Sequence, residues 1–363
     1  MLFWFLPKGT INMRMAIEGI GMTGAFGTGV ESLRSALQSG VIPLENRDAD
    51  NGYIAPVDQL TDFVPKRALR RIDHFSRMTL LSAYLAIKDA NLEGADRSRM
   101  GIVIATGYGT LQTTFKFLDS YLDFGYACSS PTHFSNSVHN AAAAHVSIQM
   151  QATAPSLTVT QFEMSVPSAL LSAQQWLTEG RVDQILFGAV DETCEVLRYC
   201  RKQFFSAAEQ GPIRPFAFAE QSAVAGEGAA FLVLTAATES AAYGYIDTVT
   251  LGNHAVCPVQ LPPDDGLLIG ADGHQECGHW YGEALGDRES ATYAPLYGSF
   301  PAAAGFDLAV AAVSLRDRTI YASPETTGAS AATVLPRRKL DQQGLACLKF
   351  GGGGDYGLIR LSG

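Results

Sequence analysis

The stretch SLTVTQFEMSVPSALLSAQQWL, residues 156–177, holds the pattern that decides the fold. A short apolar strand runs into a turn and then into a helix whose apolar residues recur at helical spacing. The stretch ATYAPLYGSFPAAAGFDLAVAAVSL, residues 291–315, repeats this order. Such internal symmetry predicts a duplicated α/β fold whose two halves are related by a pseudo-two-fold axis.

Short apolar strand candidates recur along the chain and alternate with stretches of helical periodicity. This alternation indicates parallel strands that are covered by helices on both faces. The helix predicted at 303–315 is apolar on nearly every side, which predicts that it is buried. The predicted strands lie at 15–21, 101–107, 156–160, 184–190, 229–236, 266–271, 319–323 and 344–351, and the other predicted helices at 69–91 and 163–179.

The composition is that of a globular protein: 363 residues, 47% hydrophobic and 17% charged. A net charge of −10 argues against nucleic acid as the main partner. Six cysteines without paired spacing predict a reduced, cytoplasmic setting. No stretch is long enough for a membrane span. The apolar start MLFWFLP is a poor signal peptide, and we expect residues 1–12 to form a tail before the folded part.

Cys128, in YACSSP at 126–131, stands between a small residue and two serines, as a presented nucleophile would. A reactive cysteine benefits from a helix N-terminus or a basic neighbour. The preceding run FLDSYLDFGYA is acidic and aromatic, and Pro131 follows closely. We therefore interpret Cys128 as a loop or packing cysteine.

Two further motifs imitate ligand sites. HQECGHW at 274–280 offers histidine, cysteine and glutamate, but no second ligand pair at zinc spacing is visible. FGGGGDYG at 350–357 lacks the GK[ST] ending of a phosphate-binding loop, and a strand is predicted after it, so a tight backbone corner is expected. Neither a metal nor a cofactor is predicted.

PKRALRRIDHFSR at 65–77 is the one concentrated basic patch of this acidic chain. It is either a solvated helix face or a dock for an anionic partner.

Several segments, taken in series, resemble the β-ketoacyl synthase family, and the resemblance covers nearly the whole chain from about Met13. Each motif is weak alone, but their order matches that of the family. The segments are AIEGIGMTGAFGTGVESLRSALQSG (16–40), LRRIDHFSRMTLLSAYLAIKDANL (69–92), APSLTVT (154–160), GRVDQILFGAVDE (180–192), RPFAF (214–218), AGEGAA (225–230) and KFGGGG (349–354).

The resemblance implies a thiolase-like fold with α-β-α-β-α layers. It divides the chain into a ketosynthase-like N-terminal half at 13–240 and a shortened ketosynthase-like C-terminal half at 241–363. It also removes Cys128 from the reaction, because the family's cysteine follows the strand matched here by 156–160.

At the positions of the family's reactive residues this chain has other side chains. Aligned on TVTQFEMS, the nucleophile position falls on Glu163. A carboxylate is a poor substitute for a thiol, because the mixed anhydride would be less stable than the thioester it replaced. Glu163 should open a helix, where the helix dipole favours its ionised form.

The two family histidines fall on Asp272 and Ser299, and the family lysine upstream of the second falls on Ala294. His274 lies two residues from Asp272, so a gap in the alignment would restore one histidine. The family's gatekeeper phenylalanine falls on Gly352, within a glycine turn formed by Gly351, Gly352 and Gly353.

Joint loss of nucleophile, histidines and gate points to a subunit without condensing activity. The pattern is similar to the chain-length-factor subunits of type II polyketide systems, most of all those of aryl polyene pathways. This implies a heterodimer with an active ketosynthase, and an acyl carrier protein as second partner. The alternatives are a malonyl-carrier-protein decarboxylase of ketosynthase fold and a homodimeric, silent carrier-protein binder.

The resemblance also suggests which residues meet these partners. The carrier protein is acidic, and the family's counterpart of the basic patch lies near its entrance, so Lys66, Arg67, Arg70 and Arg71 are its predicted dock. Phe134 and Val138, four residues apart and on one face if helical, together with His139, are expected to wall the partner's acyl tunnel. Leu111 and Thr114 are the expected second wall. The alternative is that these side chains pack only against their own subunit.

Overall fold

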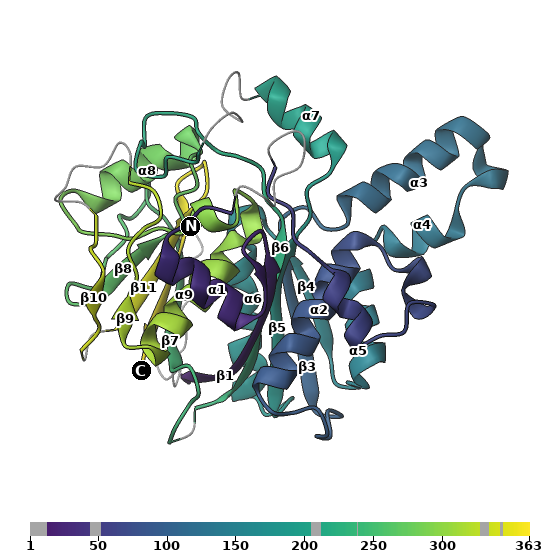
Figure 1. The fold of residues 1–363 in the computed structure, drawn as a ribbon, viewed down its shortest axis with the longest axis horizontal. Coiled ribbons are helices and arrows are strands. Elements are labelled where there is room, and N and C mark those ends of the chain that lie inside the picture. The colour runs from purple at the N-terminus through teal and green to yellow at the C-terminus, as the bar shows by residue number, and fades with distance from the viewer. Residues whose placement is uncertain (1–12, 44–51, 205–211, 238, 327–333, 342–343) are drawn as a thin grey trace, which may run out of the picture.

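A computed structural model describes residues 13–43, 52–204, 212–237, 239–326, 334–341 and 344–363 (Figure 1). The predicted tail at 1–12 lies outside the described residues. The strands are β1 (Met15–Gly24), β2 (Gly27–Thr28), β3 (Met100–Thr106), β4 (Ser156–Thr160), β5 (Gln184–Asp191), β6 (Gly228–Ala236), β7 (Tyr245–Asn253), β8 (Gly266–Ile269), β9 (Thr319–Ile320), β10 (Arg338–Lys339), β11 (Leu345–Phe350) and β12 (Asp355–Ser362).

Helices lie between several of these strands along the chain. The α-helices are α1 (Val30–Ser39), α2 (His74–Asp89), α3 (Leu111–Phe124), α4 (Pro131–Asn136), α5 (Ala141–Met150), α6 (Ser165–Thr178), α7 (Glu195–Phe204), α8 (Gln275–Leu285) and α9 (Ala304–Arg316). The 3₁₀ helices are η2 (Asp58–Asp62), η3 (Ala68–Arg71), η4 (Tyr126–Cys128), η5 (Phe162–Met164), η6 (Ala294–Leu296) and η7 (Pro301–Ala303).

The strand order shows the duplication directly. The large sheet runs β4-β3-β5-β6-β1-β7-β12-β11-β8. In the first half β3 is parallel to β4 and β5, and β6 is antiparallel to β5 and β1. In the second half β11 is parallel to β8 and antiparallel to β12, which is antiparallel to β7. Ala291 forms a parallel bridge to β8, in the place that β4 has beside β3.

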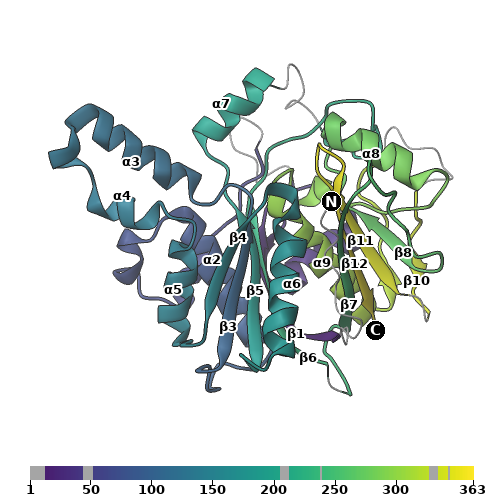
Figure 2. The same ribbon diagram turned by 180° about the vertical axis from the view of Figure 1, so that it is seen from behind.

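The helices form three layers around the two half-sheets (Figure 2). Helices α2 and α5 cover one face of the first half-sheet. Helices α6 and α9 contact strands of both halves and form the central layer, and α8 contacts β11. The predicted α-β-α-β-α arrangement is therefore confirmed.

The central helix α9 is buried along its length, from Ala304 to Leu315, as its apolar sequence predicts. Its approach to the first half-sheet depends on a glycine. A Cβ atom added at Gly305 would lie 2.3 Å from the Cβ of Ala189 on β5, so any larger residue would push the helix off the sheet.

Several details of the predicted secondary structure need correction. The sheet is mixed rather than parallel, because hairpin-like neighbours such as β11 and β12 pair antiparallel. The strand predicted at 319–323 shrinks to the two residues of β9, which pairs only with β10. The sequence prediction missed β7, whose YIDTVTLGN is only partly buried and carries polar residues that dilute the apolar signal.

The helix predicted at 69–91 is interrupted. Ile72 is extended, with φ −99° and ψ 122°, and it separates η3 from α2. The carboxylate of Asp73 accepts a hydrogen bond of 2.7 Å from the backbone N–H of Ser76 and caps α2, so a local side-chain interaction starts a new helix there.

Among the described residues, no helix is long and apolar enough to cross a membrane.

Candidate functional site

The turn between β4 and α6 has the form of a nucleophile elbow, in which a sharp turn joins a strand to a helix. Its strained residue is Phe162, with φ 45°, a value rarely adopted by a non-glycine residue. The Phe162 ring is 60% exposed and meets the ring of Tyr108 edge-on at 6.1 Å. The tip of the elbow is thus one residue before Glu163, and neither residue has a thiol.

Glu163 itself is partly buried and turns inward. One of its carboxylate oxygens lies 3.6 Å from the point where a Cβ atom of Gly351 would be. Burial raises the pKa of Glu163, and the positive charge of Lys349 opposes that rise only in part. A backbone hydrogen bond at this turn favours the ionised form of Glu163, but desolvation has the larger effect on its pKa.

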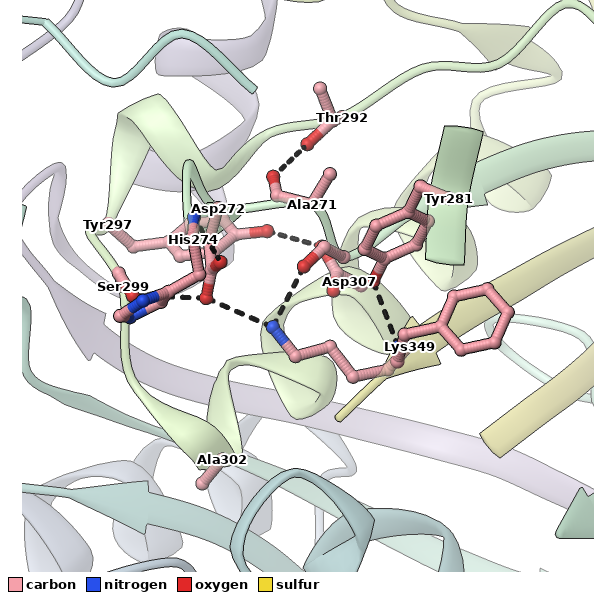
Figure 3. A network of polar contacts seen from close by, with 12 residues as sticks. Ala271, Asp272, His274, Tyr281, Thr292, Tyr297, Ser299, Ala302, Asp307 and Lys349 are labelled. Atoms are coloured by element: carbon pink, nitrogen blue, oxygen red, sulfur yellow. Dashed lines mark hydrogen bonds and ion pairs between the residues drawn. The ribbon is translucent and has the colours of Figure 1, made fainter. Parts of the chain in front are cut away.

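Asp272 and Ser299, the residues aligned with the two family histidines, meet in the interior (Figure 3). Asp272 follows the end of β8, and Ser299 precedes η7 at the start of α9. The Ser299 hydroxyl donates a hydrogen bond of 3.0 Å to Oδ2 of Asp272. Both residues are buried.

The residue that completes this cluster is Lys349, which the sequence prediction missed. Its Nζ donates to Oδ2 of Asp272 at 3.0 Å and to the carbonyl oxygen of Gly270 at 2.8 Å. Burial by itself lowers the pKa of Lys349, but the Asp272 carboxylate raises it above its ordinary value. Lys349 is therefore charged, and the site contains a buried ion pair. The sequence did contain a signal for this residue, namely a single lysine in the otherwise apolar strand LACLKF.

His274 lies at the N-cap of α8, beside Asp272. Its backbone N–H donates to Oδ1 of Asp272 at 3.4 Å, and its Nε2 lies 3.3 Å from Nη1 of Arg201 on α7. Burial lowers the pKa of His274 to about 4. The ring is therefore neutral at pH 7, and its Nε2 can accept a hydrogen bond from the guanidinium.

The other residues of HQECGHW point to separate partners. Cys277 is buried, which raises the pKa of its thiol to about 12, so it is no nucleophile at neutral pH. His279 pairs with Glu283 on the surface at 3.2 Å. Within the part of the chain that the structure describes, no group of three or more His, Cys, Asp or Glu residues could hold a metal ion.

Ala294 and the glycine turn are the remaining positions aligned with family residues. Ala294 is buried in η6 and packs in the central core. Gly351, Gly352 and Gly353 connect β11 to β12. The indole N–H of Trp280 on α8 donates a hydrogen bond of 2.9 Å to the carbonyl oxygen of Gly352. A Cβ atom at Gly352 would lie 3.2 Å from a carboxylate oxygen of Glu276.

The predicted tunnel residues lie on and beside an arm, residues 111–136, that carries α3 and α4 and projects from the body (Figure 1). Leu111 and Thr114 are in the first turn of α3, and the Thr114 hydroxyl lies 3.2 Å from the carbonyl oxygen of Ser137. Ser137 directly precedes Val138 in the sequence, so this contact places Thr114 near Val138 in space. The two predicted walls are therefore neighbours.

Phe134 and Val138 do not share a helix face, contrary to expectation. Helix α4 ends at Asn136, so Val138 lies in the turn that follows. Both side chains are exposed, and the Phe134 ring lies 5.3 Å from that of Phe117. The short helix follows from Pro131 at its first turn and from Ser130, whose hydroxyl caps it.

His139 lies over Gly109, where an added Cβ atom would be 1.9 Å from the imidazole. Gly109 also has φ +66°, so both space and backbone conformation require glycine there. Val138 and His139 line a groove of about 610 Å³ whose opposite wall is the outer edge of β4.

The predicted carrier-protein dock is at the surface. Lys66, Arg67, Arg70 and Arg71 are all exposed, and the last two belong to η3. The carbonyl oxygen of Arg71 accepts a hydrogen bond of 2.7 Å from the Asn136 side chain, so the basic segment adjoins the end of the arm. Cys128 is in η4, between α3 and α4 on that arm, and not at the elbow.

This arrangement has a strand-to-helix elbow, two inward-facing residues from the ends of other elements, and a buried lysine. It has no thiol at the elbow and no histidine at positions 272 and 299. The opposite charges of Lys349 and Asp272 neutralise each other. Asp272, Ser299 and Lys349 form one buried hydrogen-bonded cluster.

Residues 13–240 match the family model described as "Beta-ketoacyl synthase, N-terminal domain". The chain belongs to the β-ketoacyl synthase family.

Curated relatives match over part of their length. The chain is 24% identical over 241 residues to 3-oxoacyl-[acyl-carrier-protein] synthase 2 of Vibrio harveyi, covering 61% of this chain and 57% of that protein. It is 28% identical over 198 residues to the polyketide biosynthesis malonyl-ACP decarboxylase PksF of Bacillus subtilis (strain 168), covering 51% of this chain and 47% of that protein. The matched region thus spans about half the length of these relatives.

Solved structures match over nearly the whole fold. The ishigamide ketosynthase/chain length factor superposes with a TM-score of 0.77 at 17% identity, covering 97% of this chain and 99% of that one. AntDE:AntF, a type II polyketide synthase acyl-carrier protein in complex with its ketosynthase bound to the hexaketide, gives a TM-score of 0.76 at 14% identity, with 97% and 99% coverage. These likenesses establish the thiolase-like fold.

Proposed function

We propose that this chain is a catalytically silent ketosynthase-like subunit, a chain length factor. It pairs with an active β-ketoacyl-acyl-carrier-protein synthase and shapes its acyl tunnel in polyketide, aryl polyene or fatty-acid-like biosynthesis. The observation that carries the proposal is the content of the site. The elbow has Phe162 and Glu163, and the two histidine positions hold Asp272 and Ser299. Asp272 accepts hydrogen bonds from both Ser299 and the buried Lys349.

The surface supports a partner subunit. Strand β4 is at the end of the sheet order, so one side of its backbone is available for pairing. The nearby arm exposes Tyr121, Phe124, Tyr126 and Phe134 by 50% to 85% each. At roughly 200 Å² per aromatic side chain, these four alone offer about 500 Å². A stable interface buries about 800 Å² per partner, so a pairing surface that includes the arm is large enough.

The test is co-expression with a candidate ketosynthase that carries the cysteine, followed by co-purification and product analysis. We expect a stable heterodimer, and condensation that stops at a defined length only when both subunits are present. Absence of a complex with every ketosynthase encoded beside it would contradict the proposal.

The isolated subunit provides a second measurement. After incubation with an acyl-loaded carrier protein, its intact mass should be unchanged. The elbow offers no thiol nucleophile, and positions 272 and 299 offer no pair of histidines to act as acid and base. A stable acyl adduct on any residue, Cys128 included, would contradict catalytic silence.

The likeness to the Bacillus malonyl-ACP decarboxylase favours a second candidate, decarboxylation of a malonyl-carrier protein. In that reading a polar residue replaces the cysteine while the family histidines still act. Asp272 and Ser299 count against it. Release of CO₂ from malonyl-carrier protein by the isolated subunit would support decarboxylation.

A third reading is a homodimeric, silent carrier-protein binder. Sedimentation with and without the ketosynthase distinguishes it, since a homodimer that persists in the presence of the ketosynthase would favour this reading over a heterodimer.

A further inference from the structure

Lys349 has an unusual place for a lysine, because it lies inside the site that the fold builds. Its side chain comes from β11, in which every residue is buried, and it is 3% exposed itself. Lysine is almost never buried to this extent unless it is paired. Its pairing with Asp272 and the Gly270 carbonyl leaves the ammonium group fixed at one point in the interior.

That point lies between the elbow and the floor of the site, which we define as Asp272 and Ser299. The elbow η5 packs against both β11 and η7. On the elbow side, Glu163 reaches toward Gly351, two residues after Lys349, and Lys349 is the charge that acts most strongly on it. On the floor side, Lys349 and Ser299 donate to the same oxygen of Asp272.

We infer that the Lys349 side chain closes the site, by filling the space between the elbow and residues 272 and 299. This inference rests on the proposed function, in which the site makes no bond. It adds that the silent site is shut by one residue and is not merely short of a nucleophile.

The ion pair determines how this can be tested. Removing Lys349 alone would leave the carboxylate of Asp272 buried without its cation, which is strongly destabilising. Asp272→Asn removes that charge and keeps the shape of the side chain. Lys349→Met then retains nearly the length of the lysine without its charge, whereas Lys349→Ser leaves a gap.

The experiment uses Ser299→Cys as a reporter on the floor, in the full chain. Reporter alkylation by iodoacetamide is followed by peptide-resolved mass spectrometry in three backgrounds: Lys349 with Asp272, Lys349→Met with Asp272→Asn, and Lys349→Ser with Asp272→Asn. The last two backgrounds carry the same charges, and the main difference between them is the volume at position 349. The buried Cys347 reports unfolding, and the exposed Cys257 reports reagent activity.

We expect the reporter to be protected in the first two backgrounds. In the Lys349→Ser background its rate should rise by at least about tenfold while Cys347 remains protected. Equal rates in the methionine and serine backgrounds would overturn the inference, as would a reporter that reacts as fast as Cys257 while Lys349 is present.

If the serine background also exposes Cys347, it has unfolded and the methionine background decides. A folded, protected methionine variant supports closure by side-chain volume, and a folded, reactive one overturns it. Failure of this inference leaves the proposed function intact, since pairing with a ketosynthase is measured by co-purification and not by access to residue 299.

Discussion

At the scale of single residues, the buried carboxylate of Asp272 is balanced by the buried ammonium group of Lys349. The carboxylate of Asp272 cannot remain charged in the interior without a cation, and Lys349 supplies one from 77 residues away. Although burial by itself raises the pKa of Asp272, Lys349 brings it below its ordinary value. The two residues are one electrostatic unit, and neither is explained without the other.

His274 should make the fold sensitive to acid. Burial lowers its pKa from the ordinary 6.5 to about 4, against the opposing attraction of Asp272. Between these two values the unfolded chain binds a proton that the folded chain does not, so stability falls as the pH falls from 6.5 to 4. The loss from this group is at most about 3 kcal/mol. Urea unfolding at pH 7.5, 6.0, 5.0 and 4.0 measures it.

The matched control for that measurement is His274→Gln, which cannot titrate. We expect its stability to depend less steeply on pH over the same range. Identical slopes for the two proteins would show that the acid sensitivity arises elsewhere.

At the scale of elements, the arm of α3 and α4 presents the most exposed aromatic surface among the described residues. Helix α4 is only six residues long, because Ser130 and Pro131 start it and the chain turns after Asn136. The turn then carries Val138 and His139 to the groove beside β4. The arm, the turn and the β4 edge therefore form one continuous surface.

Phe134→Ala should lengthen the product of the heterodimer. Its exposed ring is expected to project into the partner's acyl tunnel, so its truncation deepens the tunnel by about the volume of a phenyl ring. The measurement is the product length made by the purified heterodimer, with sedimentation to verify that pairing is retained.

Ser135→Ala, the neighbouring exposed position on α4, is the control and should leave product length unchanged. Product of unchanged length from an intact Phe134→Ala heterodimer would assign the end of the tunnel to other residues, and Phe134 to packing against Phe117.

At the scale of the whole molecule, charge is unevenly distributed. The chain has a net charge of −10, yet Lys66, Arg67, Arg70 and Arg71 are exposed together within six residues. An acidic carrier protein would be repelled by most of this surface and attracted to this patch.

Reversing two of these charges, Arg67→Glu with Arg70→Glu, should weaken carrier-protein binding and reduce its dependence on salt. Lys88→Glu with Lys339→Glu is the control, since both positions are exposed and the net charge changes equally. Titration of the heterodimer with carrier protein at low and high salt measures both. Equal affinities for the two double variants would identify the patch as an ordinary solvated face.

Much of this protein could be predicted from sequence because the signals are local. The repeated strand, turn and helix at 156–177 and 291–315 predicted the duplication, and an apolar surface on every side predicted the buried α9. The absence of a thiol at the elbow is likewise a matter of residue identity. Aligning Glu163, Asp272 and Ser299 needed only the order of segments.

What only the tertiary structure decided involves residues that are distant in the chain. Strand directions depend on which strands pair, so the mixed sheet and the polar β7 could not be derived from periodicity. Phe162 has φ 45°, and the elbow that carries it packs against β11 and η7, which are distant in the sequence. A lysine in an apolar strand has no meaning until folding brings it to Asp272, because electrostatic pairing depends on distance in space and not on distance along the chain.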